Sequence, residues 1–375
     1  MAKAYTPGLK VTTRITHRAR RVLPIRGDVL VKKGQRVGPR DIVARTYMPG
    51  DVEPVNLANL LSLPPADVPE CMLLREGERV KKGDALAQTR GIFGLFKNTY
   101  HSRHEGTIET ISPITGQVIL RGDPIPVQVD AYLAGDVVEV VEGEGVVVEA
   151  EVTFVQGIFG IGGEAHGRIV MAGLSHDQEL TDDLVTSEMK DCVIVGGARM
   201  TDRAIKKARD VGAAAIVSGG MDDQDLKEFL GYDLGVAITG NEDVGLTVIV
   251  TEGFGEIAMA QRTYRLLQSR AGDAAAVNGA TQIRAGVMRP EIIVPLTEAD
   301  MARVPEPAHI QASVEVGMPV RIIRDPYFGL IGEVSALPAE PQTLGSGSRA
   351  RVLEVKLDSG ESVVVPRANV ELIEG

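Results

Sequence analysis

Three pairs of glycines in the second half of the chain have the placement of ligand-binding turns, because each follows an apolar run and precedes a predicted helix. The pairs are Gly196-Gly197, Gly219-Gly220, and Gly253 with Gly255. In an open parallel sheet such turns meet at the carboxyl ends of the strands, where ligands bind. Four polar residues near this edge could anchor an anion: Arg199, Thr201, Thr239 and Asn241. Two interpretations stay open, a small phosphorylated ligand or close packing of short turns.

The last of these turns also matches a nucleotide-binding pattern. Residues 253–258 read GFGEIA, which fits G-x-G-x-x-A between a strand and a helix. Backbone N–H groups there could contact a pyrophosphate. Glu252 and Glu256 would repel that anion, and the next apolar run ends at Asn278 rather than at an acidic residue for the ribose. The pattern alone therefore does not predict a nucleotide site.

The N-terminus carries a cluster of positive charge. Residues 1–45 hold 12 Lys and Arg against Asp28 and Asp41, whereas the whole chain has a net charge of −11. The candidates for contact with an acidic partner are Arg14, Arg18, Arg20 and Arg21. That partner is either a nucleic acid or the acidic remainder of this chain. A solvated, partly disordered arm over residues 1–21 is the simplest expectation.

Other chemistry has little support in the sequence. His101 and His104 stand apart from any further ligand with metal-binding spacing, and Cys71 and Cys192 are distant from each other. Neither a G-x-S-x-G turn nor a Walker loop is present. We therefore predict no catalytic set, no cofactor and no metal. With two cysteines and no run of membrane-spanning length, we expect a cytoplasmic protein without a membrane contact.

The elements that must position these residues fall into several units. With 375 residues, 42 Gly, 20 Pro and no Trp, the chain suits many short strands joined by tight turns. Strands alternate with helices over residues 181–297, which predicts an α/β domain with a mainly parallel sheet. Its best helix is expected over 256–272. We expect a β extension with a Gly-rich loop over 141–180 and a Pro-rich linker over 298–314.

A sequence motif occurs twice in the first third of the chain. Residues 34–46 read GQRVGPRDIVART and residues 77–89 read GERVKKGDALAQT. Each copy predicts one hairpin unit, and we expect the two copies to bury their apolar faces against each other in one domain over residues 22–140.

With HEGTI at 104–108 and TGQV at 115–118, this region resembles the barrel-sandwich hybrid fold of biotinyl and lipoyl carrier domains. Carrier domains place a modified Lys in a short motif just after the Gly-Asp turn. Here Gly83-Asp84 is followed by AQTRGIFG, and the first Lys is Lys97. We therefore expect a rigid docking module rather than a carrier.

The C-terminal residues 315–375 form a second β pattern. The stretch GMPVRIIRDPYFGLIGEV at 317–334 resembles the KOW motif of ribosomal proteins and transcription elongation factors, which implies a small SH3-like barrel. Its turn and core positions are Gly317, Val320, Gly329, Gly332 and Val334. The segment holds 6 Lys and Arg against 9 Asp and Glu, a charge that opposes nucleic-acid contact.

Together these observations favour a non-catalytic, multidomain interaction or scaffold protein that binds protein partners or assembles with itself. One alternative is a nucleic-acid-associated factor near the ribosome or RNA polymerase. The other is an enzyme or sensor with a small phosphorylated ligand at the glycine turns.

Overall fold

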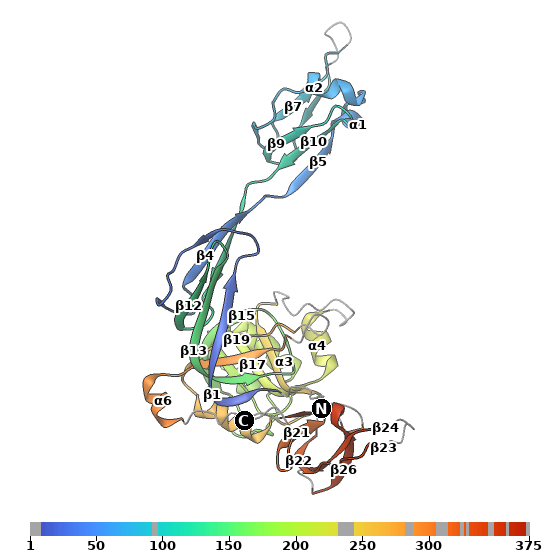
Figure 1. The fold of residues 1–375 in the computed structure, drawn as a ribbon. Helices are drawn as coiled ribbons and strands as arrows, with labels where there is room; N and C mark the ends of the chain where they lie inside the picture. The colour runs from blue at the N-terminus through green and yellow to red at the C-terminus, as the bar shows by residue number, and fades with distance from the viewer. Residues whose placement is uncertain are drawn as a thin grey trace.

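The computed structural model describes residues 9–91, 97–231, 244–281, 288–304, 314–322, 326–327, 330–343, 349–357 and 360–372. Strands account for 46% of the residues and helices for 17%, so the protein is mixed α/β and rich in strands. Figure 1 shows a main body, a narrow connection made of strands, and a small β unit at the far end of that connection. A second small β unit, formed by the C-terminal residues, lies against the body.

The body contains an 11-stranded sheet with the order β14-β18-β17-β16-β15-β19-β20-β13-β12-β3, and β1 pairs with β13. The strands are β14 Phe159–Ile161, β18 Thr247–Phe254, β17 Ala215–Met221, β16 Cys192–Val195, β15 Glu164–Met171, β19 Ala274–Asn278, β20 Glu291–Pro295, β13 Gly145–Gln156, β12 Gly135–Val141, β3 Arg36–Val37 and β1 Val11–Val22. Strands β15 to β18 are parallel, and the others join antiparallel. The sheet is therefore mixed, and the expectation of a mainly parallel sheet is wrong. Apolar runs such as β19 are buried in either direction of pairing, so their composition does not reveal it.

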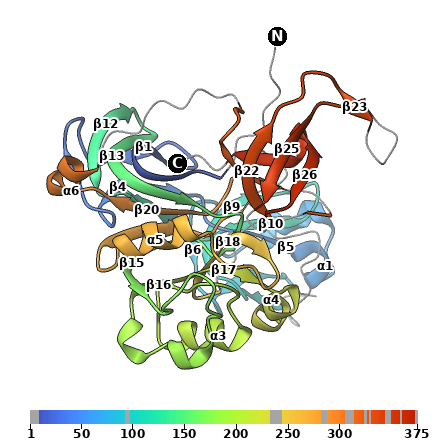
Figure 2. The ribbon, with the colours of Figure 1, turned by 90° about the horizontal axis from the view of Figure 1, so that it is seen from below.

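Helices cover both faces of the parallel strands (Figure 2). Helices α3 (Asp202–Asp210) and α4 (Asp223–Leu230) pack on one face, and α5 (Gln261–Ser269) packs on the other. Thr201 is the N-cap of α3, because its hydroxyl accepts a hydrogen bond from the Ala204 N–H. The α5 helix is shorter than the predicted 256–272. The helix begins only at Gln261, because the Met259 N–H before it donates to the carbonyls of both His176 and Gly197.

The two copies of the repeat lie in two separate β modules. We call the first the proximal module: β2 Asp28–Val29, β3, β4 Ile42–Met48, β11 Ile125–Asp130 and β12, packed on the first part of β13. The second is the distal module, residues Val52–Arg121: β5 Val52–Asn56, α1 Leu57–Leu61, η1 Pro65–Asp67, α2 Val68–Cys71, β6 Arg79–Val80, β7 Ala85–Gln88, β8 Thr99–His101, β9 Gly106–Ile111 and β10 Gln117–Arg121.

Four strands have the same order and the same antiparallel pairing in the two modules. The strand order β1-β13-β12-β3 of the first corresponds to β5-β10-β9-β6 of the second, and all pairs are antiparallel. In the first copy the Asp41 carboxylate accepts from the Gly38 N–H at 2.8 Å, and in the second the Asp84 carboxylate accepts from the Lys81 N–H at 2.9 Å. The Gly and Asp positions of the repeated motif thus lie in turns in both copies.

Each copy has its own hydrophobic core, so the expectation that the two copies share one core is wrong. Val37 and Val43 belong to a cluster with Leu133 and Phe154, whereas Val80 and Leu86 belong to a cluster with α1, β9 and β10. The physical reason is nesting: the distal module is inserted between β4 and β11 of the proximal module. Each hairpin therefore finds its packing partner within its own module.

Part of the predicted basic arm forms a strand. Within residues 9–21, Val11 onwards forms strand β1, which pairs with β13 from Val11↔Val155 to Val22↔Gly145. The basic segment is therefore a sheet strand and not a free arm, because its backbone completes the ladder of β13.

The C-terminal unit is a five-stranded antiparallel sheet with the order β26-β25-β22-β21-β27, accompanied by the small pair β23 and β24. The strands are β21 Pro319–Ile322, β22 Ile331–Ala336, β23 Gln342–Thr343, β24 Arg349–Ala350, β25 Val352–Leu357, β26 Ser362–Pro366 and β27 Val370–Leu372, with the turn η4 Arg367–Asn369. Of the predicted motif positions, Val320 and Val334 are core residues, and Gly332 approaches the backbone of β25. Gly329 lies outside the described residues. Helix α6 (Glu298–Arg303) and the turns η2 Asp182–Leu184 and η3 Ser187–Met189 complete the described elements.

The separate cores lead to a matched test. Leu86 and Val43 occupy corresponding buried positions of the two copies. We expect Leu86→Ala to destabilise the distal module by about 2–5 kcal/mol and to speed amide hydrogen exchange there only. Val43→Ala should speed exchange in β4, β11 and β12 and leave the distal module protected. Leu60→Ala, at an exposed position of α1, serves as the control. Equal acceleration of both modules by either core variant would contradict separate cores.

Candidate functional site

The three predicted glycine turns do come together at one edge of the parallel strands. The Gly219 N–H donates to the Gly197 carbonyl at 3.0 Å, and the Gly255 N–H donates to the Met221 carbonyl at 3.0 Å. Arg199 forms an isolated bridge with Gly220. The three turns therefore lie next to one another, as the sequence predicted.

Backbone from the same chain occupies the space beside these glycines. A Cβ atom on Gly219 would lie 2.3 Å from the Met259 nitrogen, and one on Gly197 would lie 2.2 Å from the Ser175 carbonyl oxygen. A Cβ atom on Gly220 would meet the Gly255 carbonyl oxygen at 2.3 Å. Close packing of the turns accounts for these glycines, and ligand binding at the turns stays a prediction.

The polar residues of this edge are engaged within the fold. The Arg199 guanidinium hydrogen-bonds to Asp225 at 2.9 Å and is within 3.7 Å of three further carboxylates. Those three belong to Glu179, Asp222 and Glu256. Such surroundings repel an added phosphate. Thr201 caps α3, and Thr239 and Asn241 lie outside the described residues.

Each of the four N-terminal arginines pairs with a glutamate of this chain. Arg14 pairs with Glu151 and Arg18 with Glu149, both on β13. Arg20 lies 3.9 Å from Glu144, and Arg21 makes a two-pronged pair with Glu164 at 2.5 and 2.7 Å. The acidic partner proposed for this segment is thus found within the chain, while nucleic-acid contact stays a prediction.

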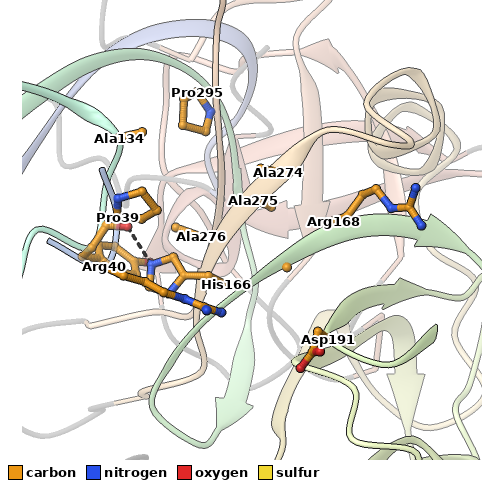
Figure 3. Close-up of a pocket in the computed structure, with 12 residues that line it drawn as sticks. Pro39, Arg40, Ala134, His166, Arg168, Asp191, Ala274, Ala275, Ala276 and Pro295 are labelled. Atoms are coloured by element: carbon orange, nitrogen blue, oxygen red, sulfur yellow. Dashed lines mark hydrogen bonds between the residues drawn. The ribbon is translucent and has the colours of Figure 1, made fainter. Parts of the chain in front are cut away.

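A cavity that the sequence did not indicate lies between the proximal module and the sheet (Figure 3). Its volume is about 300 Å³. Pro39, Arg40, Tyr132 and Ala134 line it from the proximal module. The sheet side and its neighbouring turn contribute His166, Gly167, Arg168, Asp191, Ala274, Ala275, Ala276 and Pro295. A mainly apolar cavity with a few polar groups at a junction of modules is the usual form of a ligand site.

Tyr132 is held rigidly in the wall of this cavity. Its backbone is left-handed, with a φ of 63°, and its side chain is 3% exposed. The hydroxyl donates to Glu291 at 3.1 Å, and the Arg21 guanidinium lies 5.2 Å from the ring centre. The His166 Nε2 donates to the Tyr132 carbonyl at 2.9 Å.

Burial shifts the acid–base behaviour of this wall. It raises the pKa of the Glu291 carboxyl above the ordinary 4.5, while the hydrogen bond from Tyr132 acts in the opposite direction. Burial and the nearby Glu291 charge raise the pKa of the Tyr132 phenol well above 10.0. Single residues scattered from position 21 to position 291 build this cluster, so no motif in the sequence could reveal it.

A second buried cluster joins the C-terminal unit to the body. Arg321 of β21 pairs with Glu252 of β18, and the two side chains are only 4% and 1% exposed. Glu252 also accepts from the Ala260 N–H at 3.0 Å, next to the glycine turn. Arg289 and Glu371 form a further pair across the same junction. Glu252 is therefore a structural anion here and does not face an open phosphate site.

Within the described residues, no group of three His, Cys, Asp or Glu side chains is arranged to hold a metal ion. None of the described helices has the length and apolar character needed to cross a membrane. Cys71 and Cys192 are both free and buried. No protein-family model matches the chain, and no curated protein matches it. The two fold resemblances seen in the sequence stay predictions.

The buried pair predicts a strong effect of a single substitution. Arg321→Met leaves the Glu252 carboxylate buried without its cation, and we expect it to lower the free energy of unfolding by about 3–5 kcal/mol. Adding Glu252→Gln removes the stranded charge and retains an acceptor for the Ala260 N–H, so the double variant should recover most of that loss. Urea unfolding followed by circular dichroism measures both. Arg349→Met, at an exposed arginine of the same unit, is the control, and equal loss in the single and double variants would contradict this account.

The raised pKa of Glu291 predicts a pH dependence. A carboxyl whose pKa is raised in the folded state stabilises the fold below its unfolded pKa, and this contribution is lost as the pH rises through the folded pKa. The parent should therefore lose stability relative to Glu291→Gln as the pH rises above the ordinary carboxyl value of 4.5. Urea unfolding of both proteins between pH 4 and 8 checks this. Glu139→Gln, an exposed position, controls for the loss of one charge. A difference between parent and Glu291→Gln that stays constant with pH would refute the expectation.

Proposed function

We propose that the protein is a non-catalytic interaction protein whose distal module docks a partner away from the body. The observation that carries this proposal is the insertion of a complete module at the end of a narrow connection (Figure 1). Strands β4 and β11 pair up to Met48↔Ile125, and both chain segments then continue into the distal module. A module with its own core at such a position gains access to a partner while the body stays clear of it.

The connection itself is built for close approach of the two segments. A Cβ atom on Gly50 would lie 2.1 Å from the Gly122 carbonyl oxygen, so no other residue fits there. The Gly122 N–H donates to the Asp51 carbonyl at 2.9 Å, and Arg121 donates to the Gly50 carbonyl at 3.1 Å. These hydrogen bonds hold the two chain segments of the connection together. The connection is therefore better described as a spacer of fixed length than as a flexible linker.

The distal module exposes apolar side chains that suit a docking surface. Ile114 is 85% exposed in the turn between β9 and β10, and Leu60 is 48% exposed on α1. The two elements are in contact, because the Ala58 N–H donates to the Gly116 carbonyl at 3.1 Å. Exposed apolar groups on adjoining elements of one module are typical of interaction surfaces.

The resemblances noted in the sequence agree with such a role. Both modules have a hairpin whose turn is closed by an Asp carboxylate, Asp41 or Asp84, and we propose the barrel-sandwich hybrid fold for each of them. For the C-terminal unit we propose the SH3-like barrel that the KOW resemblance implies, supported by its five antiparallel strands around a common core. Folds of this kind position partners in many assemblies, which is an argument by analogy.

A deletion variant tests the proposal. Because Met48 and Ile125 are ladder partners, residues 49–124 can be replaced by Asn-Gly, which closes β4 and β11 as a hairpin. We expect the shortened protein to keep the body fold, as judged by circular dichroism and hydrogen exchange. Affinity purification from the native host should recover a stoichiometric partner with the full chain and lose it with the deletion variant.

Point variants separate docking from folding. Leu60→Ser with Ile114→Ser should lose the same partner without a change in unfolding temperature, because both side chains are exposed. Val364→Ser, at a 51% exposed position of the C-terminal unit, is the matched control and should retain it. A full chain that is monomeric by light scattering and recovers no partner would overturn the proposal, as would a partner that binds equally well to the deletion variant.

A further inference from the structure

The cavity beside Tyr132 has the properties of a small-molecule site that is independent of partner docking. It lies at the base of the proximal module, so it is separate from the distal surface proposed above. Its floor on β19 runs from the buried Ala276 to the exposed Ala274, which share one face of the strand, and Pro39 and Pro295 add apolar contacts. Alanine side chains leave the space open, and methyl and ring carbons facing a cavity of about 300 Å³ favour an apolar ligand body.

Cations at its rim are without carboxylate partners. Arg40 and Arg168 line the cavity, and neither makes an ion pair within the described part of the chain, whereas the nearby Arg21, Arg36 and Arg45 each pair with a carboxylate. Figure 3 shows Arg40 beside His166 on one side of the alanine floor, with Arg168 and Asp191 on the other. An unpaired guanidinium at an apolar cavity favours a ligand carboxylate, which it can bind with two parallel hydrogen bonds.

The wall is rigid and strained, which is typical of a binding site. Among the described residues only Ser62, Tyr132 and Asp191 have a positive φ without being glycine, and two of these three line the cavity. Left-handed backbone costs energy and persists where the surroundings enforce it, often at ligand sites. Here Glu291, Arg21 and His166 enforce it by holding the Tyr132 hydroxyl, ring and carbonyl. The cavity is thus formed before a ligand arrives.

From these observations we infer that the cavity binds a small organic carboxylate with an apolar body. The body lies on the alanine floor against the rigid Tyr132 wall, and the carboxylate pairs with Arg40. Arg168 and Asp191 on the opposite side carry opposite charges, so Arg40 supplies the unbalanced positive charge. Such a ligand would contact both the proximal module and the sheet, and would therefore stabilise their junction.

Calorimetric titration with benzoate, octanoate and 2-naphthoate tests this inference on the full-length protein. We expect at least one of these carboxylates to bind with a millimolar or lower dissociation constant, and its uncharged amide to bind about tenfold more weakly. Arg40→Gln should remove that difference by weakening the carboxylate only. Arg36→Gln, a neighbouring arginine whose partner is Asp136, is the control and should bind like the parent.

A second variant tests the location. Ala274 is exposed at the mouth of the cavity, so Ala274→Phe fills it without disturbing the core and should abolish binding of both carboxylate and amide. The unfolding temperature of each variant verifies its fold. No binding by any of the three carboxylates would overturn the inference, as would binding that survives Ala274→Phe. Equal binding by inorganic phosphate would show that the apolar body contributes nothing and would overturn it too.

Discussion

The ladder between β1 and β13 is the interaction on which the rest of the structure depends. Strand β13 is 12 residues long and pairs with β1 over almost its whole length. Its first part pairs with β12 in the proximal module, and its last part pairs with β20 in the body. Val148 packs in the proximal core and Val155 in the core under α5. One continuous strand therefore belongs to two cores and fixes the angle between them.

This constraint explains the unusual charge of the N-terminus. Strand β13 and the turns near it carry glutamates, and an edge strand beside them must compensate that charge. The arginines of β1 do so in register, since Arg14 and Arg18 face Glu151 and Glu149. Exposed pairs of this kind contribute little stability individually. They disfavour other registers, however, because a slip by one residue would reverse the faces of β1 and separate the charges.

Local patterns in the sequence were enough to predict many of the elements. They could not predict which elements pair when these are far apart in the sequence. The alternation of strands and helices and the hairpin unit of each repeat copy depend on neighbouring residues, and both were predicted. The insertion of one module inside the other was not predicted. Both copies carry the same motif, and no local feature of the sequence indicates which partner each hairpin packs on. Likewise the convergence of the glycine turns was predicted, but the backbone at Met259 that fills the space beside them was not.

The cavity follows from the same geometry. The proximal module meets the sheet along β13, and its residues Pro39 and Tyr132 line the cavity together with residues of the neighbouring strands β15 and β19. Small residues on β19 leave a gap beneath them, because a sheet that twists away from a module attached along one strand cannot pack against it everywhere. Larger side chains at Ala274 and Ala276 would close that gap by ordinary apolar packing. Tyr132 keeps its strained backbone although open space lies beside it. This strain favours a ligand as the group that completes the junction.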